Sequence, residues 1–411
     1  MTSSVMSIRA DRLRRDIEAI AACTATPGAG ASRPTFSDAW GAARAYVVGE
    51  LERCGCRVRT DAAGNVHARP AGVGWEAPVW LSGSHIDSVP HGGDFDGVTG
   101  VVVPLELLRA AHESGRDDLP LELIVFAEEE GPTFGLGMLG SRAWVGDLTA
   151  EDLGRLRNAA GQSYLDAGAM YGVQPGEIGR KRPGAYRGFV EVHVEQGPGM
   201  WDRGTPLALV NAIAGRRQYR GRITGRANHA GSTGMADRQD ALAGAAEVML
   251  QLEALARRLS PQTVATVGQL VVRPGALNVI PGEADFSLDF RSPDDALLEE
   301  GERQIEALLA GTTMRRGLSA TLEATEVQPA IALDADVCNR LQQAAVRAGH
   351  GPLPVTVSGA LHDAAIVAPH VPTAMLFVAS RDGISHNPDE FSRIEDIAAA
   401  AEVLRALVTH E

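Results

Sequence analysis

The sequence lacks any run of eighteen or more apolar residues, and its first fifteen residues become charged without an apolar signal core. We therefore expect no transmembrane helix and a cytoplasmic location. Positive charge is also in deficit, because 38 Lys and Arg residues stand against 52 Asp and Glu residues, a net charge of −14. This balance argues against nucleic acid or an anionic membrane as a partner and leaves a small-molecule substrate open.

Cysteine is rare, with four residues in 411. So few cysteines fit reduced thiols in a large enzyme better than a disulfide framework. Cys54-Gly55-Cys56 could suggest a metal site, but no second thiol pair completes a tetrahedral set of ligands. We interpret both cysteines as structural residues.

The chain is too long for one ordinary hydrophobic core, and its pattern of predicted elements changes twice. Helices and strands first alternate as a mainly parallel mixed sheet requires. Residues 213–329 instead predict the order β-α-β-β-α-β, which is the ferredoxin-like split βαβ motif. The first pattern then resumes. We expect an α/β fold with a discontinuous domain formed by residues 1–212 and 330–411, and an inserted α+β domain formed by residues 213–329.

Polar residues gather where the predicted strands end. Ligands of open α/β sheets bind beyond the carboxyl ends of the strands, so we expect these side chains to meet. Taken singly, a His-x-Asp pair could be a hydrogen-bonded histidine at a strand end, and a glutamate run could be a solvated turn. The set consists of His85, Asp87, Asp96, Glu129, Glu130, His193 and His386.

Imidazole and carboxylate ligands without a thiol suit zinc, manganese, cobalt or nickel. About six protein contacts serve two metal ions, and a bridging carboxylate lets two such ions lie roughly 3.5–4 Å apart. Asp96 is the natural bridge. One glutamate of the run is expected to bind a metal, and its neighbour to act as general base on a metal-activated water.

These motifs resemble those of the M20-type di-metal amidohydrolases and exopeptidases. The resemblance covers essentially the whole chain, including the inserted domain, and rests on His85-x-Asp87, Asp96, Glu129-Glu130-Gly131 and His386. The segment His193-Val194-Glu195-Gln196-Gly197-Pro198 resembles the branch that cleaves N-carbamoyl groups. That branch contains N-carbamoyl-L-amino-acid hydrolases, β-ureidopropionases and allantoate amidohydrolases.

The resemblance implies two divalent metal ions per subunit. It implies that His85 and His193 ligate one metal, that Glu130 and His386 ligate the other, and that Asp96 bridges them. Zinc is the first choice, with manganese, cobalt or nickel as alternatives.

The resemblance also implies Glu129 as the general base and Asp87 as the carboxylate behind His85. We expect His362 to support the metal site without being a ligand, and Glu128 to be a supporting or solvated carboxylate.

Further residues match substrate contacts of the family. His229 matches the histidine that polarises the scissile carbonyl, and Asn278 and Arg291 match anchors of the substrate carboxylate. Gln196 and the backbone at Gly359 match contacts to the carbamoyl group and the carboxylate. A planar ureido group suits the amide of glutamine, and a carboxylate suits a guanidinium group. The resemblance also implies that the inserted domain closes over the site as a lid and mediates a homodimer.

Two departures from the pattern of the carbamoyl branch concern the substrate. The branch often has arginine after the glutamate run, where this chain has Gly131-Pro132-Thr133-Phe134, and often has glycine at the position of Leu361. Both change the expected pocket wall and leave the metal chemistry intact.

The predicted reaction is hydrolysis of the carbamoyl C–N bond of an N-carbamoyl-L-amino acid, with release of ammonia, carbon dioxide and the amino acid. One alternative is an allantoate amidohydrolase or β-ureidopropionase. A second is an M20-type aminoacylase or peptidase. A third is a metal-bound scaffold without catalysis.

Overall fold

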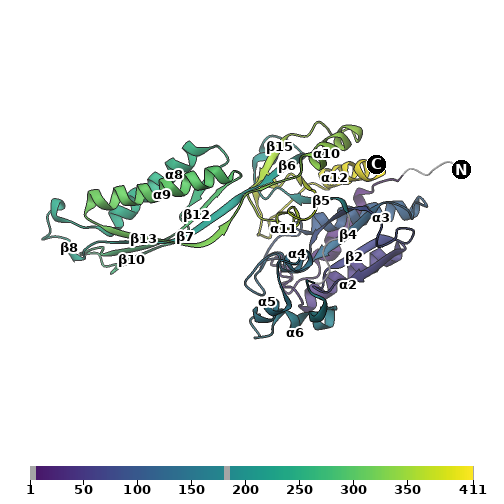
Figure 1. Ribbon diagram of the computed structural model, residues 1–411, viewed down its shortest axis with the longest axis horizontal. Coiled ribbons are helices and arrows are strands. Elements are labelled where there is room, and N and C mark those ends of the chain that lie inside the picture. Colours follow the sequence, from purple (N-terminus) through teal and green to yellow (C-terminus); the bar gives the residue numbers. More distant parts are fainter. Residues whose placement is uncertain (1–5, 180–185, 411) are drawn as a thin grey trace. The chain divides into compact units, whose positions relative to one another are not determined.

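The computed structural model describes residues 6–179 and 186–410. The chain divides into two compact units, which Figure 1 shows with their helices and strands labelled. The large unit comprises Met1–Asn211, Leu333–Thr356 and Leu361–Glu411, and the inserted unit comprises Ala212–Ala332 and Val357–Ala360. Within the two described ranges, no helix is both long enough and apolar enough to cross a bilayer.

A nine-stranded mixed sheet has the order β1-β2-β4-β3-β5-β16-β6-β14, with β15 also paired to β6. The four neighbours β4, β3, β5 and β16 run parallel, and the other strands on this path pair antiparallel. The predicted α/β fold with a mainly parallel mixed sheet is confirmed at its centre. The strands are β1 (Cys56–Thr60), β2 (Val66–Pro70), β3 (Val79–His85), β4 (Leu121–Phe126), β5 (Tyr186–Val194), β6 (Leu207–Ile213), β14 (Ile331–Ala332), β15 (Val355–Ser358) and β16 (Thr373–Val378).

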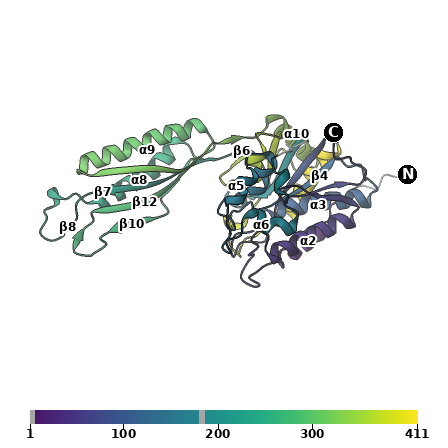
Figure 2. The ribbon, with the colours of Figure 1, turned by 60° about the horizontal axis from the view of Figure 1, so that its bottom comes forward.

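The central strands are buried on both faces, as parallel strands covered by helices must be. Every residue of β3, β4 and β16 is buried. Helix α3 (Val98–Glu113) packs on β3, β4 and β5, and α12 (Ile394–Thr409) packs on α3. Figure 2 shows α3 between β4 and α2 (Asp38–Arg53). The remaining long helices of this unit are α1 (Ala10–Ala21) and α10 (Ala335–Arg347).

Several short helices of the large unit were not predicted from the sequence. Helices of four to seven residues are too short to show a periodic apolar stripe. Two of them begin with a capping box, formed by Thr149 with Asp152 and by Ser163 with Asp166. These capping boxes are the sequence signals that could have predicted where the two helices begin. These helices are α4 (Leu139–Val145), α5 (Ala150–Arg155), α6 (Tyr164–Gly168), α7 (Gly199–Asp202) and α11 (Asp363–Val367).

The inserted unit has an antiparallel sheet of order β10-β12-β7-β13, with β9 also paired to β12. The second strand of the predicted β-α-β-β-α-β order is split into two short strands, β9 and β10. Thr266 pairs with Asp289 and Leu270 pairs with Phe286, so three residues between these pairs face two on β12, and the extra residue breaks the ladder. The elements are β7 (Gly215–Thr224), α8 (Ala241–Leu259), β9 (Val264–Thr266), β10 (Leu270–Arg273), β12 (Glu283–Ser292), α9 (Asp295–Arg316) and β13 (Ser319–Gln328).

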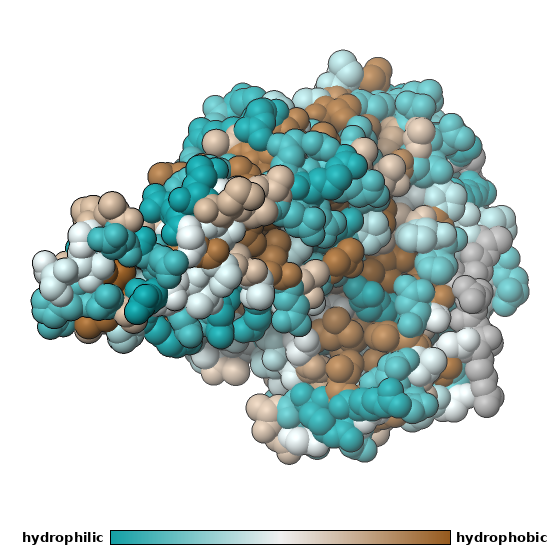
Figure 3. All heavy atoms as spheres, turned by 60° about the vertical axis from the view of Figure 1, so that its left-hand side comes forward, coloured by the Kyte–Doolittle hydropathy of each residue, from teal (hydrophilic) through white to brown (hydrophobic). Residues whose placement is uncertain are grey.

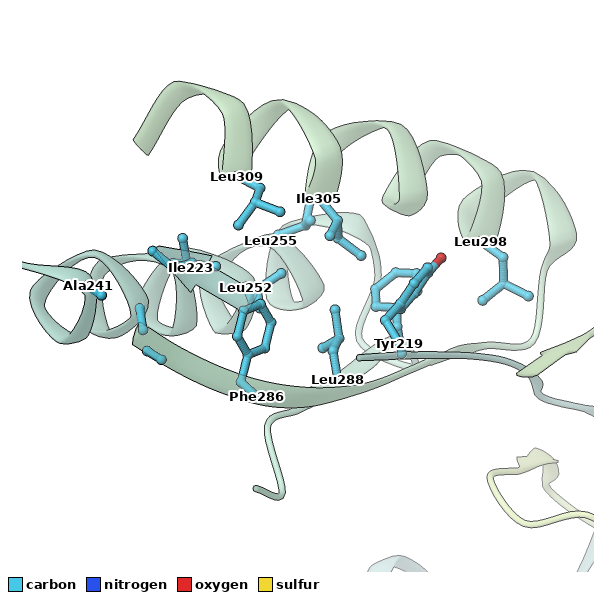
Figure 4. Close-up of a cluster of buried hydrophobic side chains, with 14 residues drawn as sticks. Tyr219, Ile223, Ala241, Leu252, Leu255, Phe286, Leu288, Leu298, Ile305 and Leu309 are labelled. Atoms are coloured by element: carbon cyan, nitrogen blue, oxygen red, sulfur yellow. The ribbon is translucent and has the colours of Figure 1, made fainter. Parts of the chain in front are cut away.

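This unit has a hydrophobic core of its own. Alternate residues of β12 are buried, and Figure 4 shows Phe286 and Leu288 directed toward the helices. Helix α8 contributes Leu252 and Leu255, and α9 contributes Leu298, Ile305 and Leu309. Each such side chain stabilises the fold by roughly 1.5–3 kcal/mol when fully buried.

On the face drawn in Figure 3, hydrophilic side chains predominate and apolar ones lie between them.

The chain leaves the nine-stranded sheet along β6 and returns along β14, where Ile213 pairs with Ile331. The main segment of the inserted unit, Ala212–Ala332, therefore begins and ends at neighbouring backbone positions.

Candidate metal centre

Two histidines reach the site because β3 and β5 are parallel neighbours in the sheet. His85 is the last residue of β3, and His193 is the last but one of β5. Ser82 pairs with Val190, so the same offset carried three residues further brings His85 level with His193. The parallel strand β4 lies on the other side of β3 and leads into the glutamate run 128–130. Three strand ends therefore deliver nitrogen and oxygen ligands to one edge.

Two groups of possible ligands share Asp96. In the first, the ligand atoms of His85, Asp96 and His193 lie within 4.8 Å of one another. His193 Nε2 is 3.2 Å and His85 Nε2 is 3.7 Å from Asp96 Oδ1. In the second group, His386 Nε2 is 3.2 Å from Asp96 Oδ2 and 3.5 Å from Glu130 Oε2. Asp96 thus offers one carboxylate oxygen to each group.

The backbone orients the two buried histidines. His85 Nδ1 lies 3.1 Å from the carbonyl oxygen of Asp87, and His193 Nδ1 lies 3.0 Å from that of Val194. Each Nδ1–H donates to its carbonyl, so Nε2 is the nitrogen turned toward Asp96. Gly97 makes room for His85. Its φ is 65°, and a Cβ there would lie 2.4 Å from the imidazole ring.

Asp87 supports the site in a way that the sequence did not suggest. Its carboxylate Oδ1 is 3.6 Å from His85 Nδ1, farther than its own backbone oxygen. The carboxylate instead accepts the backbone N–H groups of Glu129 and Glu130, at 3.3 and 3.1 Å. Burial raises the pKa of Asp87 to about 6, although these N–H groups oppose the shift. Asp87 therefore joins the end of β3 to the glutamate run.

The three adjacent glutamates turn in different directions. Glu129 Oε2 is 3.7 Å from His85 Nε2, and Glu130 belongs to the second ligand group. Glu128 has a left-handed backbone, φ 57°, and its Oε1 accepts the N–H groups of Thr133 and Phe134 at 3.0 Å each. Glu128 thus stabilises the following turn, as its predicted supporting role requires.

The charges of the site favour cations. Burial, and then the neighbouring carboxylates, raise the pKa values of Glu129 and Glu130 well above their usual range. Burial lowers the pKa of His193, but contact with Asp96 outweighs it and raises this pKa to about 9. Buried carboxylates so close together are costly unless cations neutralise them. The donor set, all imidazole and carboxylate, therefore fits divalent metal ions.

His362 lies beside the first ligand group. Its ring packs edge-on against His193, with 4.4 Å between the ring centroids. Burial, and then the charge of His193, hold the pKa of His362 well below its usual range, so the imidazole is neutral. Glu191 completes a third group with these two histidines and accepts the Ser84 hydroxyl at 2.7 Å and the Ala364 N–H at 2.8 Å.

His229 and Asn278 are neighbours in the inserted unit. The short strands β8 (Asn228–His229) and β11 (Val279–Ile280) pair there, and the Ala230 N–H donates to the Asn278 carbonyl oxygen at 2.9 Å. His229 Nδ1 accepts the N–H groups of Gly231 and Ser232, at 3.0 and 3.1 Å. The proton of the neutral imidazole is therefore on Nε2, which is left as a donor.

Arg291 and Gly359, also of the inserted unit, are in direct contact. Arg291 Nη1 donates to the Gly359 carbonyl oxygen at 2.8 Å. Its Nε and Nη2 donate to the Asp289 carboxylate at 2.7 and 3.2 Å. These contacts use three of the five guanidinium N–H groups and leave two for a ligand.

The model of the family described as peptidase family M20/M25/M40 matches residues 81–410. The chain belongs to this family. The predicted family is confirmed, and so is the resemblance to its carbamoyl branch, which the named relatives of the chain represent.

These M20 relatives match along nearly their whole length. An N-carbamoyl-L-amino acid amidohydrolase of Geobacillus stearothermophilus is 36% identical, over 97% of each chain. An allantoate amidohydrolase of Escherichia coli is 31% identical, over 93% of each chain. A crystal structure of a hydantoinase/carbamoylase family amidase from Burkholderia multivorans is 34% identical, has a TM-score of 0.92 and covers 98% of each chain.

In this M20 chain, several residues near the metal ligands escaped prediction. One is Glu191, which lies inside β5 and belongs to the third group of possible ligands. Gly97, Ser385 and Glu390 contact a residue of the site, but each looks ordinary in the sequence. The only readable signal is that Ser385 and Glu390 flank His386 in one polar segment. Their partners lie hundreds of positions away, where no local pattern points to them.

Proposed function

We propose that the chain is a dinuclear-metal amidohydrolase that hydrolyses the carbamoyl C–N bond of an N-carbamoyl-L-amino acid. One water is consumed, and ammonia, carbon dioxide and the amino acid are released. The observation that carries the proposal is the pair of ligand groups that share Asp96, whose carboxylate also accepts from Gln196. The named amidohydrolases among the relatives support the reaction class. The large unit is then the catalytic domain, and the inserted unit the lid.

The ligand groups suggest which residues hold each metal. His85 and His193 would hold one ion, Glu130 and His386 the other, and Asp96 both. When bound, the two ions act as Lewis acids and lower the pKa of water to about 7. Zinc fits this nitrogen and oxygen set best, and manganese, cobalt or nickel would also fit.

Glu129 is the proposed general base. It follows the end of β4, and Asp87 holds its backbone N–H. Its carboxylate Oε2 lies 3.7 Å from His85 Nε2 of the first ligand group, so it is placed to take a proton from an attacking water there. The same group can then return the proton to the terminal nitrogen as its C–N bond breaks, so that neutral ammonia leaves. The N-carboxy amino acid that remains loses carbon dioxide to give the amino acid.

Gln196 is the proposed contact for the carbamoyl group. Its Nε2 donates to Asp96 Oδ2 at 2.8 Å, while its buried Oε1 has no hydrogen-bond partner among the described residues. An unsatisfied buried acceptor is costly, and the NH2 end of a carbamoyl group would supply the missing donor.

The inserted unit supplies the other proposed substrate contacts. The Nε2–H of His229 can donate to the carbonyl oxygen as it becomes negative. Arg291 retains two N–H groups for the substrate carboxylate. Asn278 and the backbone at Gly359 lie beside these two residues and complete the proposed contacts.

An ammonia-release screen tests the proposal. The metal-loaded protein is incubated with N-carbamoyl-L-amino acids, allantoate and 3-ureidopropionate, and the metal-stripped protein is the control. We expect ammonia from at least one N-carbamoyl-L-amino acid, and none without metal. Amine release from dipeptides or N-acyl amino acids, with no ammonia from any ureido compound, would contradict the proposal and favour the aminoacylase or peptidase function.

Allantoate is the second candidate substrate. The relatives include an allantoate amidohydrolase of nearly equal coverage. The segment Gly131-Pro132-Thr133-Phe134 and Leu361 also differ from the pattern expected of the carbamoyl branch. A higher kcat/KM for allantoate than for every N-carbamoyl-L-amino acid would establish allantoate as the substrate. The proposed metal ligands and general base would be unchanged.

We also propose a cytoplasmic homodimer that forms through the inserted unit. Strand β10 is the first strand of its sheet, and its outer edge has no strand partner among the described residues. Leu270 and Val271 of this strand are exposed, as is Leu277 just beyond it. Light scattering tests this state, and a monomer at micromolar concentration would contradict it.

A further inference from the structure

Glu390 joins two loops of the large unit that are almost 300 positions apart. It is 5% exposed. Its Oε2 accepts the backbone N–H groups of Phe95 and Asp96, at 2.8 and 3.1 Å, and its Oε1 accepts the Ser385 hydroxyl at 3.0 Å. Gly93 permits this approach, because a Cβ there would lie 2.1 Å from Glu390 Oε2. Glu390 therefore holds the backbone of the ligand that the two metal groups share.

Ser385 connects Glu390 to Gln196. Its Oγ lies 3.0 Å from Glu390 Oε1, 3.3 Å from Asp96 Oδ2 and 3.2 Å from Gln196 Nε2. An ionised carboxylate only accepts hydrogen bonds, so the single hydroxyl proton goes to one of the two carboxylates. The serine oxygen must then accept from Gln196.

The orientation of the Gln196 amide follows from this pattern. Its Nε2 donates both to Ser385 Oγ and to Asp96 Oδ2, so the NH2 side of the amide faces the carboxylates. Reversing the amide would place Oε1 against Asp96, where two acceptors would repel. The amide therefore presents its oxygen, and not its NH2 group, to any other partner.

The backbone of the same segments is strained. Gln196 and His386 both have left-handed backbone angles, with φ values of 57° and 54°. Such conformations persist where the surrounding contacts fix them, and they concentrate at functional sites. Here the Gln196 N–H donates to Ser380 Oγ at 3.0 Å, and Ser385 directly precedes His386.

We propose that Ser385 and Glu390 are positioning residues that hold the shared ligand Asp96 and fix Gln196 as a hydrogen-bond acceptor. This inference rests on the proposed function, since it assigns Gln196 a selective role toward the substrate. An acceptor at this point favours a substrate group that carries N–H, such as the terminal NH2 of a carbamoyl group. The methyl group of an acetyl substrate cannot satisfy it, so the orientation selects carbamoyl over acetyl substrates.

The variant Ser385→Ala tests the selectivity. The measurement is the ratio of kcat/KM for an N-carbamoyl amino acid to that for the N-acetyl derivative of the same amino acid. We expect the ratio to fall about fivefold, the worth of one hydrogen bond, because Asp96 still holds the amide in part. The matched control is Ser392→Ala, which removes a buried hydroxyl that donates to the Ala379 carbonyl oxygen instead. An unchanged ratio in Ser385→Ala would overturn the selective role.

Glu390 variants test, without any substrate, whether Glu390 stabilises metal binding by positioning Asp96. The readout is the rate at which the loaded protein loses metal to a chelator. We expect Glu390→Ala to lose metal about 10–100 times faster. Glu390→Gln should restore the wild-type rate, because its oxygen can accept from Phe95 and Asp96 while its NH2 group donates to Ser385. Wild-type metal loss in Glu390→Ala, or equal damage in both variants, would overturn this role.

The two readouts separate this inference from the proposed function. If the wild-type protein releases no ammonia from any ureido compound, the proposed function fails. The positioning role of Glu390 is then decided by metal loss alone. If Glu390→Ala does not fold, Glu390→Gln and Ser385→Ala decide the inference. Wild-type metal retention in Glu390→Gln with a reduced carbamoyl preference in Ser385→Ala supports it, and any other pair of results overturns it.

Discussion

The proposed metal ligands and the proposed substrate contacts of the inserted unit are held in different ways. His85, Asp96 and His193 are buried, and their partners come from three distant segments of the chain. His229 and Asn278 are exposed, and the imidazole Nδ1 of His229 accepts the N–H groups of Gly231 and Ser232. The tertiary fold thus buries the metal centre and ties Asp96 to a segment 294 positions away, whereas His229 and Asn278 lie exposed at a pair of short strands. Substitutions far away in the sequence should therefore affect metal binding. Substitutions at the inserted-unit residues should affect substrate binding without changing the metal content.

The sharpest test of this comparison is Glu129→Gln. The amide removes the proposed base and keeps the shape, so kcat should fall about 10²–10⁴-fold while the metal content stays at the wild-type value. Ammonia release and elemental analysis of the same preparation measure both. Glu128→Gln is the matched control, because Glu128 caps a neighbouring turn. A Glu129→Gln variant with near wild-type kcat would remove the assigned role.

Raising the pH should weaken the large unit alone. His67 is buried between Glu122 and Asp61, at 2.6 and 3.3 Å. Burial lowers its pKa, but the two carboxylates outweigh burial and raise it to about 9. Because the folded value lies above the unfolded value of about 6.5, this stabilisation is complete below pH 6.5 and is lost as the pH rises through 9. The loss should reach about 3 kcal/mol.

Tryptophan fluorescence during urea unfolding measures this effect, because all five tryptophans lie in the large unit. The free energy of unfolding should fall between pH 6.5 and 9.5 in the wild-type protein. His67→Gln should be less stable at pH 6.5 and should show a much flatter dependence on pH. The same slope in both proteins would show that His67 is not the group responsible.

The smallest expected effect concerns Arg291. Arg291→Ala should raise KM about 10–100-fold for a substrate with a carboxylate, the worth of a charged hydrogen bond of about 1.5–3 kcal/mol. Metal content should not change, because Arg291 contacts Asp289 and Gly359 of its own unit. The control is Arg222→Ala, an exposed arginine that pairs with Asp285 in the same sheet. Steady-state kinetics that match for both variants would exclude the anchoring role.

The sequence allowed part of this arrangement to be predicted, and the limits have physical causes. The histidines and glutamates were visible because each follows an apolar strand, and parallel strands bring their carboxyl ends to one edge. The roles of Ser385 and Glu390 could not be predicted, because a hydrogen bond to a residue 294 positions away produces no pattern in the local sequence. The sequence did not predict that the Asp87 carboxylate accepts the N–H groups of Glu129 and Glu130, because this contact joins two strand ends more than forty positions apart.

The pairing of Ile213 with Ile331 has a consequence for engineering. Paired residues on antiparallel strands have Cα atoms only about 4.5–5.5 Å apart, so a tight turn can join them without moving either strand. The whole segment between them can therefore be excised, or exchanged for that of a homologue, at a single junction. Such chimaeras would separate the contribution of the inserted unit to substrate preference from that of Gln196, which stays with the large unit.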